Sequence, residues 1–329
     1  MKSFGLAQPG SLDAAIRASG ESFVASRWLA GGTDLLATIK ERVDAPERLV
    51  NLKTIPDLAS IEVTAERTVI GALATHTEVA EHVGIREHHP ALVEAILATA
   101  TPQIRNVATI GGGLCQRPRC WYFRHPDYPC RKKGGATCYA QEGENEFHTI
   151  FDNGTCCAVH ASNIAPILLA YDAVLIVRGS GGEREVALDD FFVDPDDNVM
   201  VENILAPGEL ITRIEIPAAA RGWGEAYVEV RDKQSFDWAL TAATVLVKAS
   251  GGAVEDSRVV LSAVAPRPLR LPRVEALLRG RVDEEALSAA GEAACAGATP
   301  LEQNGYKLAL VRATIARAAR SAISRARKG

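Results

Sequence analysis

The sequence is poor in the features that mark nucleic-acid-binding and membrane proteins. Aromatic residues make up 5% of its 329 residues, which is few for a surface that stacks bases, and the net charge of −5 provides no basic surface for phosphates. No apolar run reaches the roughly 18 residues of a membrane-spanning helix. We therefore expect a protein that binds neither nucleic acid nor membrane.

The N-terminus lacks a targeting signal. Residues 1–5 read Met-Lys-Ser-Phe-Gly, and the apolar core of a signal peptide does not follow them. This absence predicts a cytoplasmic protein with reduced thiols. Export to the periplasm on the twin-arginine signal of a partner subunit is the alternative.

Nucleotide-binding fingerprints are missing as well. The two glycine-rich turns, residues 29–35 and 104–112, match neither G-x-G-x-x-G nor G-x-x-x-x-G-K, so neither a Rossmann nor a P-loop site is supported. The turns still offer backbone N–H groups that no side chain obstructs, and the first leads into a predicted helix, which suits a phosphate. Each turn alone is equally an ordinary turn, with Thr33 and Asp34 as helix caps.

The remaining pattern is that of a globular protein with mixed secondary structure. The apolar content of 47% and the length allow two or three domains. Alternating strand and helix patterns predict an α/β or α+β fold. The predicted helices are residues 11–19, 35–41, 91–100 and 164–171, and the predicted strands are 23–29, 48–52, 60–63, 68–72 and 173–178.

A change of composition at residues 217–224 predicts the start of a third part of the chain. Strands are predicted there at 226–231, 239–248 and 258–265, followed by three helical segments. The last segment, residues 306–328, alternates apolar and basic residues with helical spacing and is predicted to be an amphipathic helix.

The cysteines are clustered in one part of the chain. Six of the seven cysteines fall within residues 115–157, and an odd number in a long chain favours metal binding or catalysis over disulfides. Their spacing matches neither the ferredoxin run nor a paired C-x2-C zinc site. The residues alone therefore leave the metal open between zinc and an iron-sulfur cluster. Cys115 and Cys295 are expected to be packed, apolar side chains.

The two glycine-rich turns in their order, together with residues 227–247, resemble the FAD-binding middle subunit of the xanthine dehydrogenase family of molybdenum hydroxylases. The resemblance covers nearly the whole chain. It implies an α+β fold, with two FAD-binding subdomains of the vanillyl-alcohol-oxidase type at residues 1–55 and 56–220, and a flavoprotein C-terminal domain at 221–329. The cofactor-binding residues that it implies are Ala30, Gly31, Gly32, Thr33, Asp34, Leu35, Thr109, Ile110, Gly111, Gly112 and Asn163.

The cysteine-rich insert, residues 115–160, is similar to that of two relatives, the middle subunits of bacterial aldehyde oxidoreductases and of 4-hydroxybenzoyl-CoA reductase. The similarity lies in residues 117–124, in the stretch 142–145 and in the cysteines. It implies a 4Fe-4S cluster, and Cys156 is preferred over the adjacent Cys157 because only one of two neighbouring side chains points readily toward a given centre. The implied ligands, spaced C-x9-C-x7-C-x17-C, are Cys120, Cys130, Cys138 and Cys156.

Charged and polar neighbours of these cysteines bear on the type of centre. Basic residues gather along the insert, and positive charge raises the potential of an iron-sulfur cluster; a solvated loop explains them equally well. His125, His148 and His160 could ligate the centre or form hydrogen bonds to it, but structural hydrogen-bond donors are the first expectation for each. The basic residues are Arg117, Arg119, Arg124, Arg131, Lys132 and Lys133.

Two positions depart from the pattern of the relatives. Gly113 stands where they usually carry Asn, which removes a side-chain donor. Asn163 stands where they usually carry an Asp that faces the flavin, so an amide replaces a charge. Both changes are expected to alter the tuning of the flavin more than its binding. Residues 230–238 resemble the segment of the relatives that crosses near the flavin.

The function that the resemblance implies is electron transfer within a heterotrimer. FAD and a 4Fe-4S cluster in this chain would pass electrons from the 2Fe-2S clusters of a small subunit to an external acceptor. A large molybdenum-cofactor subunit would oxidise the substrate, so no catalytic residue is assigned here. An aldehyde oxidoreductase is the first expectation and a 4-hydroxybenzoyl-CoA reductase-like enzyme the second. A stand-alone flavin oxidase with a structural zinc is the alternative from another class, and a cofactor-free scaffold would leave the turns and the cysteines unexplained.

Overall fold

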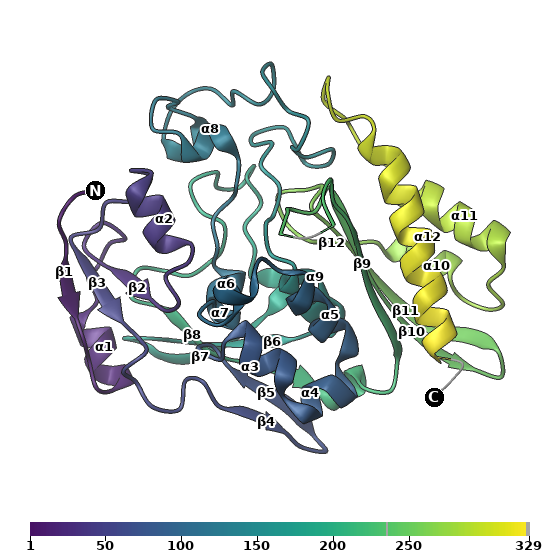
Figure 1. The fold of residues 1–329 in the computed structure, drawn as a ribbon, viewed down its shortest axis with the longest axis horizontal. Helices are drawn as coiled ribbons and strands as arrows, with labels where there is room; N and C mark the ends of the chain where they lie inside the picture. Colours follow the sequence, from purple (N-terminus) through teal and green to yellow (C-terminus); the bar gives the residue numbers. More distant parts are fainter. Residues whose placement is uncertain (235, 327–329) are drawn as a thin grey trace.

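The computed structural model describes residues 1–234 and 236–326. In these residues three sheets lie side by side, with helices packed between them and the cysteine-rich insert above them (Figure 1). Every one of the seven cysteines is free. Among the described helices, none combines the length and the hydropathy that crossing a membrane would require.

The N-terminal sheet is small and parallel. Strand β3 (Arg48–Asn51) lies between β1 (Gly5–Ala7) and β2 (Arg27–Leu29). Helix α1 (Leu12–Ala18) begins at Ser11, whose hydroxyl accepts a hydrogen bond from the backbone N–H of Ala14, and α2 (Leu35–Lys40) follows β2. The strands connect through helices because parallel neighbours cannot be joined by a tight turn. The first glycine-rich turn is thereby fixed between β2 and α2.

The central sheet is antiparallel and has the order β4-β5-β8-β6-β7. Its inner strands alternate buried and half-buried residues, as expected when helices cover one face. Strand β8 pairs with β5 and β6 although it lies far from both in the sequence. The strands are β4 (Ile61–Val63), β5 (Arg67–Gly71), β6 (Val174–Gly179), β7 (Gly182–Ala187) and β8 (Leu210–Pro217).

A group of helices covers this sheet and forms the main hydrophobic core with it. Helix α9 is buried along its whole length, which is typical of a helix with packing on all sides. The helices are α3 (His76–Glu81), α4 (Val83–His88), α5 (Pro90–Ala98), α6 (Pro102–Arg105), α7 (Ile110–Leu114) and α9 (Ile164–Ala170), and the 3-10 turns η2 (Leu188–Asp190) and η3 (Ala218–Ala220) lie beside β7 and β8.

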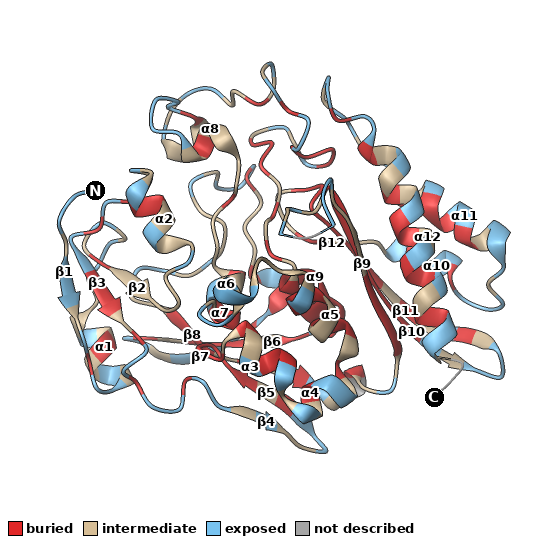
Figure 2. Ribbon diagram, in the orientation of Figure 1, coloured by how far each residue is buried: buried red, intermediate tan, exposed pale blue. Residues whose placement is uncertain are grey.

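The C-terminal sheet has the order β12-β11-β10-β9 and is covered on both faces. Helix α12 (Lys307–Ala326) packs on β9 and β10, while α5 and α9 lie against the same sheet from the central part (Figures 1 and 2). The other elements are β9 (Gly224–Val230), β10 (Thr241–Ser250), β11 (Ala253–Ser262), β12 (Leu269–Arg270), α10 (Pro272–Leu277) and α11 (Glu284–Ala293).

The cysteine-rich insert contains little regular structure. Its described elements are α8 (Trp121–Arg124), the 3-10 turn η1 (Arg131–Lys133) and one isolated bridge between Cys130 and Thr137. Hydrogen bonds to other parts of the chain hold it: Ile150 N–H, for example, donates to Val264 O in the C-terminal part at 2.9 Å. The insert is therefore ordered by long-range contacts rather than by its own secondary structure.

The expected local elements match the structure closely, with small shifts at their ends. The predicted strand 23–29 is shorter, since only Arg27–Leu29 pairs with a neighbour, and residues 23–25 form a turn. The helix expected at 306–328 begins at Lys307 and is described to Ala326, and positions 327 and 328 lie outside the described residues. No strand was predicted at residues 210–217, where the structure has β8, the middle strand of the central sheet.

A buried carboxyl group joins the central and C-terminal parts. Glu225 in β9 is 1% exposed, and its Oε2 accepts hydrogen bonds from Tyr171 Oη at 2.5 Å and from Ala91 N–H at 3.2 Å. Burial raises the pKa of Glu225 to about 8. At neutral pH the folded protein therefore keeps a proton on this group that the unfolded chain releases.

This raised pKa predicts a pH-dependent stability. Since the folded pKa lies above the unfolded value, the contribution is fully present below about pH 4.5 and is lost as pH rises through about 8. We expect Glu225→Gln to match the wild type near pH 5 and to exceed it near pH 8.5, by on the order of 2–4 kcal/mol in the free energy of unfolding. Urea unfolding at both pH values measures the difference. Glu62→Gln, on an exposed strand position, is the control, and a gap that does not change with pH would contradict the assignment.

Candidate functional site

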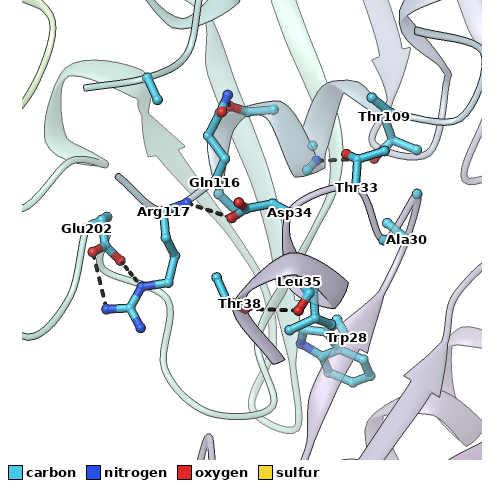
Figure 3. A pocket seen from close by; sticks show the side chains of 18 of the residues that line it. Trp28, Ala30, Thr33, Asp34, Leu35, Thr38, Thr109, Gln116, Arg117 and Glu202 are labelled. Atoms are coloured by element: carbon cyan, nitrogen blue, oxygen red, sulfur yellow. Dashed lines mark hydrogen bonds and ion pairs between the residues drawn. The ribbon is translucent and has the colours of Figure 1, made fainter. Parts of the chain in front are cut away.

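A cavity of about 500 Å³ opens between the N-terminal sheet, the central helices and the insert (Figure 3). Its size lies within the range of cofactor sites. Both glycine-rich turns line it, although 68 residues separate them in the sequence. The predicted cofactor residues that line it are Ala30, Gly31, Gly32, Thr33, Asp34, Leu35, Thr109, Gly111, Gly112 and Asn163. The remaining one, Ile110, is fully buried in the central core.

The two turns pack backbone against backbone. A Cβ atom added to Gly31 would lie 2.0 Å from the carbonyl oxygen of Val107, and one added to Gly111 would lie 2.8 Å from the Cβ of Ala72. Gly32 has a φ of +74°, in the left-handed region that glycine adopts without strain. Glycine is therefore required at 31 and 111 because neighbouring atoms leave no room for a Cβ, and at 32 because the backbone has a positive φ. The walls they form present peptide groups to the cavity.

The second turn is fixed by a helix cap. Thr109 precedes α7, and its Oγ1 accepts a hydrogen bond from Gly112 N–H at 3.2 Å. Backbone bonds tie the same turn to the central sheet: Gly111 N–H donates to Ala72 O at 2.9 Å. The turn is thus rigid before any ligand binds, which favours tight binding because little conformational entropy is lost.

Asp34 connects the first turn to the cysteine-rich insert. It occupies the cap position of α2, but its side chain makes no cap hydrogen bond, so its interpretation as a simple cap is wrong. Its carboxylate instead accepts a hydrogen bond from Arg117 N–H at 2.8 Å (Figure 3). It also pairs with Arg119 at 2.6 Å and with Arg124 at 2.7 Å. Arg124 also pairs with Glu41 at 3.0 Å. Three residues of the insert therefore hold the turn.

Neutralising Asp34 is expected to loosen both the turn and the insert. In Asp34→Asn the half-buried Arg119 and Arg124 lose their shared negative partner, which should lower the free energy of unfolding by about 1–3 kcal/mol and weaken FAD binding about tenfold. Thermal unfolding and FAD titration of the deflavinated protein measure the two effects. Glu41→Gln is the matched control, because it removes a more exposed partner of the same arginine and should change both values little. Equal effects of the two substitutions would contradict this role of Asp34.

Asn163 also lines the cavity, and its amide is bound by a carboxylate. Its Nδ2 donates to Glu229 Oε2 at 3.1 Å, and Tyr227 Oη donates to the same oxygen at 2.7 Å. Burial raises the pKa of Glu229 above its usual range. The side chain that replaces the expected aspartate is therefore oriented by β9 of the C-terminal part.

Several lining residues carried no signal in the sequence. Trp28 donates from Nε1 to Glu209 O at 2.7 Å, and Glu202 pairs with Arg117 at 3.1 Å. Both ring nitrogens of His76 are buried, and neither has a partner within the part of the chain that the structure describes. Burial lowers the pKa of His76 to about 4, so its ring is neutral at pH 7.

The segment expected near the flavin, residues 230–238, reaches the cavity in part. Phe236, Asp237 and Trp238 line it, and the Arg119 guanidinium lies 4.9 Å from the centre of the Trp238 ring. Lys233 is not among the lining residues, and Ser235 lies outside the described residues. Phe236, Asp237 and Trp238 are thus the members of this segment that line the cavity.

Four cysteines of the insert line a second, smaller cavity of about 20 Å³, which on the scale of buried water sites holds about one water molecule. They are Cys120, Cys130, Cys138 and Cys156, the four predicted ligands. Cys157 is fully buried and does not line the cavity; its Sγ donates to Asn153 O at 3.4 Å. Cys115 lines the large cavity, and Cys295 packs in the C-terminal core.

The thiols differ in their electrostatic surroundings. Burial raises the pKa of Cys120 to about 12 and also raises that of Cys156. The hydrogen bond with Cys157 lowers the pKa of Cys138 to about 6. Among the described residues, no three histidine, cysteine or acidic side chains are grouped closely enough to bind a single metal ion. The four thiols surround a space rather than converge on one point.

The basic residues are distributed differently from the expectation. Arg117, Arg119 and Arg124 turn toward Asp34, Glu41 and Glu202, whereas only Arg131 and Lys132 line the cysteine cavity. Lys132 is 5% exposed and also pairs with Glu202, at 3.0 Å. The positive charges near the first glycine-rich turn are thereby neutralised, because acidic residues from distant segments pair with them.

The expected roles of the three insert histidines differ in the structure. His125 lies 3.9 Å from Asp127 and is exposed, and the His160 ring packs against Phe192 at 4.7 Å. His148 is buried, and its Nε2 lies 3.2 Å from Cys120 Sγ. Of the three, His148 is the one that contacts a predicted ligand.

Comparison with known proteins gives consistent matches over both halves of the chain. Residues 2–219 match the FAD binding domain in molybdopterin dehydrogenase, and residues 225–322 match the CO dehydrogenase flavoprotein C-terminal domain. The aldehyde oxidoreductase FAD-binding subunit PaoB of Escherichia coli (strain K12) is 34% identical over 88% of this chain and 89% of its own length. The carbon monoxide dehydrogenase medium chain of Hydrogenophaga pseudoflava is 29% identical, with 96% of each chain covered.

The fold is similar to that of a chain in a solved CO dehydrogenase structure. A chain of the reconstituted CO dehydrogenase from Oligotropha carboxidovorans superposes with a TM-score of 0.78 and 26% identity, covering 98% of this chain and 99% of that one.

Proposed function

The chain belongs to the family that combines the FAD binding domain of molybdopterin dehydrogenases with the CO dehydrogenase flavoprotein C-terminal domain, and we propose that it is the FAD-binding, electron-transferring subunit of a molybdenum hydroxylase. The observation that carries the proposal is the single cavity lined by both glycine-rich turns. Bound FAD would accept electrons in pairs and release them singly. We propose that the substrate is oxidised on a partner subunit.

The residues of this chain would bind and orient the cofactor. Gly31, Gly32, Gly111 and Gly112 let the FAD pyrophosphate approach the backbone. Because Gly111 N–H and Gly112 N–H already donate to Ala72 O and Thr109 Oγ1, the N–H groups that would bind it are those of the first turn. Asp34 holds the first turn through the insert, and Asn163 is held by Glu229 at the opposite wall. In this proposal residues 1–55 and 56–220 form two subdomains of the vanillyl-alcohol-oxidase type around FAD, and residues 221–329 form the third domain. The separate sheets of the three parts support that division.

The four cysteines around the small cavity support a 4Fe-4S cluster as the second cofactor. Thiolates are the usual ligands of such a cluster, and four of them are supplied here by separate segments of one insert. The cluster would occupy space that the cysteine side chains and their loops now partly fill. Those loops contain few backbone ladders that would resist such a movement. An iron-sulfur centre carries single electrons, which suits a relay beside FAD.

Aldehyde oxidation is the proposed activity of the whole complex. The relative that is 34% identical is named as a subunit of an aldehyde oxidoreductase. We propose a heterotrimer with a large molybdenum-cofactor subunit and a small 2Fe-2S subunit, which would deliver electrons to this chain. An external acceptor then removes them.

Cofactor and subunit analysis of the native complex tests the proposal. After anaerobic purification, we expect about four irons, equivalent sulfide and one FAD per chain, together with a larger and a smaller subunit. Zinc with FAD would reject the cluster and keep the flavin site. A protein without flavin, or a homodimer that oxidises substrate alone, would reject the proposed function.

A further inference from the structure

His148 occupies a distinctive place in the cysteine-rich insert. Its side chain is buried, and Nε2 lies 3.2 Å from the Sγ of Cys120, within hydrogen-bonding distance of sulfur. Trp121 packs edge-on against the ring, with centroids 5.2 Å apart at 73°. The imidazole is therefore held in one orientation, with one nitrogen directed at a predicted cluster ligand.

The position of the ring hydrogen follows from its surroundings. The other ring nitrogen, Nδ1, is buried and has no hydrogen-bond partner in the described part of the chain. A hydrogen on Nδ1 would leave a buried donor unpaired, whereas a hydrogen on Nε2 can be donated to sulfur. The arrangement therefore favours the tautomer in which His148 donates to Cys120.

The backbone of His148 is fixed by buried polar groups of the C-terminal part. Lys307, fully buried at the start of α12, donates from Nζ to His148 O at 3.0 Å, to Phe147 O at 3.1 Å and to Ala263 O at 3.3 Å. Asn304 Nδ2 donates to His148 O at 3.3 Å and to Thr149 O at 3.0 Å. These bonds fix the backbone from which the imidazole reaches toward Cys120.

Burial lowers the pKa of Lys307 to about 7, so without a negative partner its amine is only partly charged at neutral pH. No carboxylate lies within ion-pair distance of it among residues 1–234 and 236–326, although burying an unpaired charge is costly. Four thiolates around an iron-sulfur core carry net negative charge. A loaded centre next to His148 would therefore supply negative charge close to this buried amine and favour its protonated, positively charged form.

We propose that His148 donates a hydrogen bond to the Cys120 sulfur and raises the reduction potential of the metal centre, with Lys307 and Asn304 as positioning residues. Donation to the sulfur and nearby positive charge both stabilise the reduced, more negative state of a cluster. The inference rests on the proposed 4Fe-4S centre. It implies that residues of the C-terminal part, at the start of α12 and just before it, influence the reduction potential of the cluster in the insert.

Potentiometric titration of the native complex, followed by low-temperature EPR, tests this role. We expect His148→Phe to retain about four irons per chain and to titrate at a lower midpoint potential than the wild type. His148→Gln keeps a donor and should restore much of the shift. His160→Phe is the control, since His160 is a buried histidine of the same region that packs on Phe192 and should leave the potential unchanged.

The experiment distinguishes an error in the role of His148 from an error in the proposal that the protein contains a cluster. A wild-type complex without iron and sulfide would overturn both. A full cluster signal in His148→Phe at the wild-type potential would overturn the role of His148 alone. If that variant loses iron, Lys307→Met provides the second test: a lower potential supports the inference, and an unchanged one overturns it.

Discussion

Gly31→Ala is expected to abolish stable FAD binding, with an affinity at least one hundred-fold weaker than that of the wild type, or about 3 kcal/mol. The added Cβ would lie 2.0 Å from the carbonyl oxygen of Val107 and 2.8 Å from its carbon. Both are backbone atoms of the second glycine-rich turn, so no side chain can rotate away to relieve the overlap. The two turns must separate, and the cavity between them loses its shape.

Flavin content after purification and FAD titration of the deflavinated protein measure this effect. Gly305→Ala is the control, because a Cβ there meets no atom within 4 Å and the backbone has no positive φ. Gly112→Ala should be intermediate, since its Cβ would lie 3.0 Å from Thr109 Oγ1, a side-chain atom that can move at the expense of a helix cap. Full flavin content in Gly31→Ala would show that the turns do not form the site together.

Cys156→Ala is expected to lose most of its iron, whereas Cys157→Ala, at the adjacent residue, is expected to keep all of it. Cys156 lines the small cavity with three other cysteines, whereas the Cys157 sulfur donates to the carbonyl of Asn153. Removing Cys156 takes away one of four proposed ligands, so iron should fall from about four per chain to below about one. Removing Cys157 should leave the iron content unchanged.

The iron, sulfide and FAD content of both variants is measured after anaerobic purification and compared with that of the wild type. FAD should be retained in both variants, because neither cysteine lines the large cavity. The reverse pattern would identify Cys157 as the fourth ligand. Full iron in both variants would reject the four-cysteine site.

The two proposed cofactor sites share side chains. Glu202 lines the large cavity and pairs with Arg117 at 3.1 Å and with Lys132 at 3.0 Å, while Lys132 lines the cysteine cavity. Asp34 adds a second link through Arg119 and Arg124. A change in one site therefore alters the positions of charges in the other, which gives a structural reason to measure both cofactors in every variant.

The local elements could be predicted because their signals are local. Ser11 caps α1 at the start of the helix predicted at residues 11–19. The short helix α6, which Thr101 and Pro102 begin, was not predicted, because these residues were expected only to end the preceding helix. The apolar run of β10 predicts a strand, and its burial on both faces explains why it does not alternate. Strand β8 was missed although its residues 210–217 carry a strand pattern, with β-branched Ile and Thr and an alternation of buried and half-buried positions at 213–216. Its place in the middle of the sheet depends on pairing with β5 and β6, which the sequence pattern does not specify.

The sequence by itself determined the components: two turns whose glycines permit close backbone approach, and an insert with the four cysteines that we propose as ligands of a metal centre. Only the tertiary structure decided how they are used. The arginines expected near the cysteines pair with Asp34 and Glu41, because long-range folding brings opposite charges together at a half-buried boundary. In the same way α12 brings Lys307 to the backbone of His148, across 159 positions of sequence. Partners of this kind are set by packing in three dimensions, and no spacing along the chain encodes them.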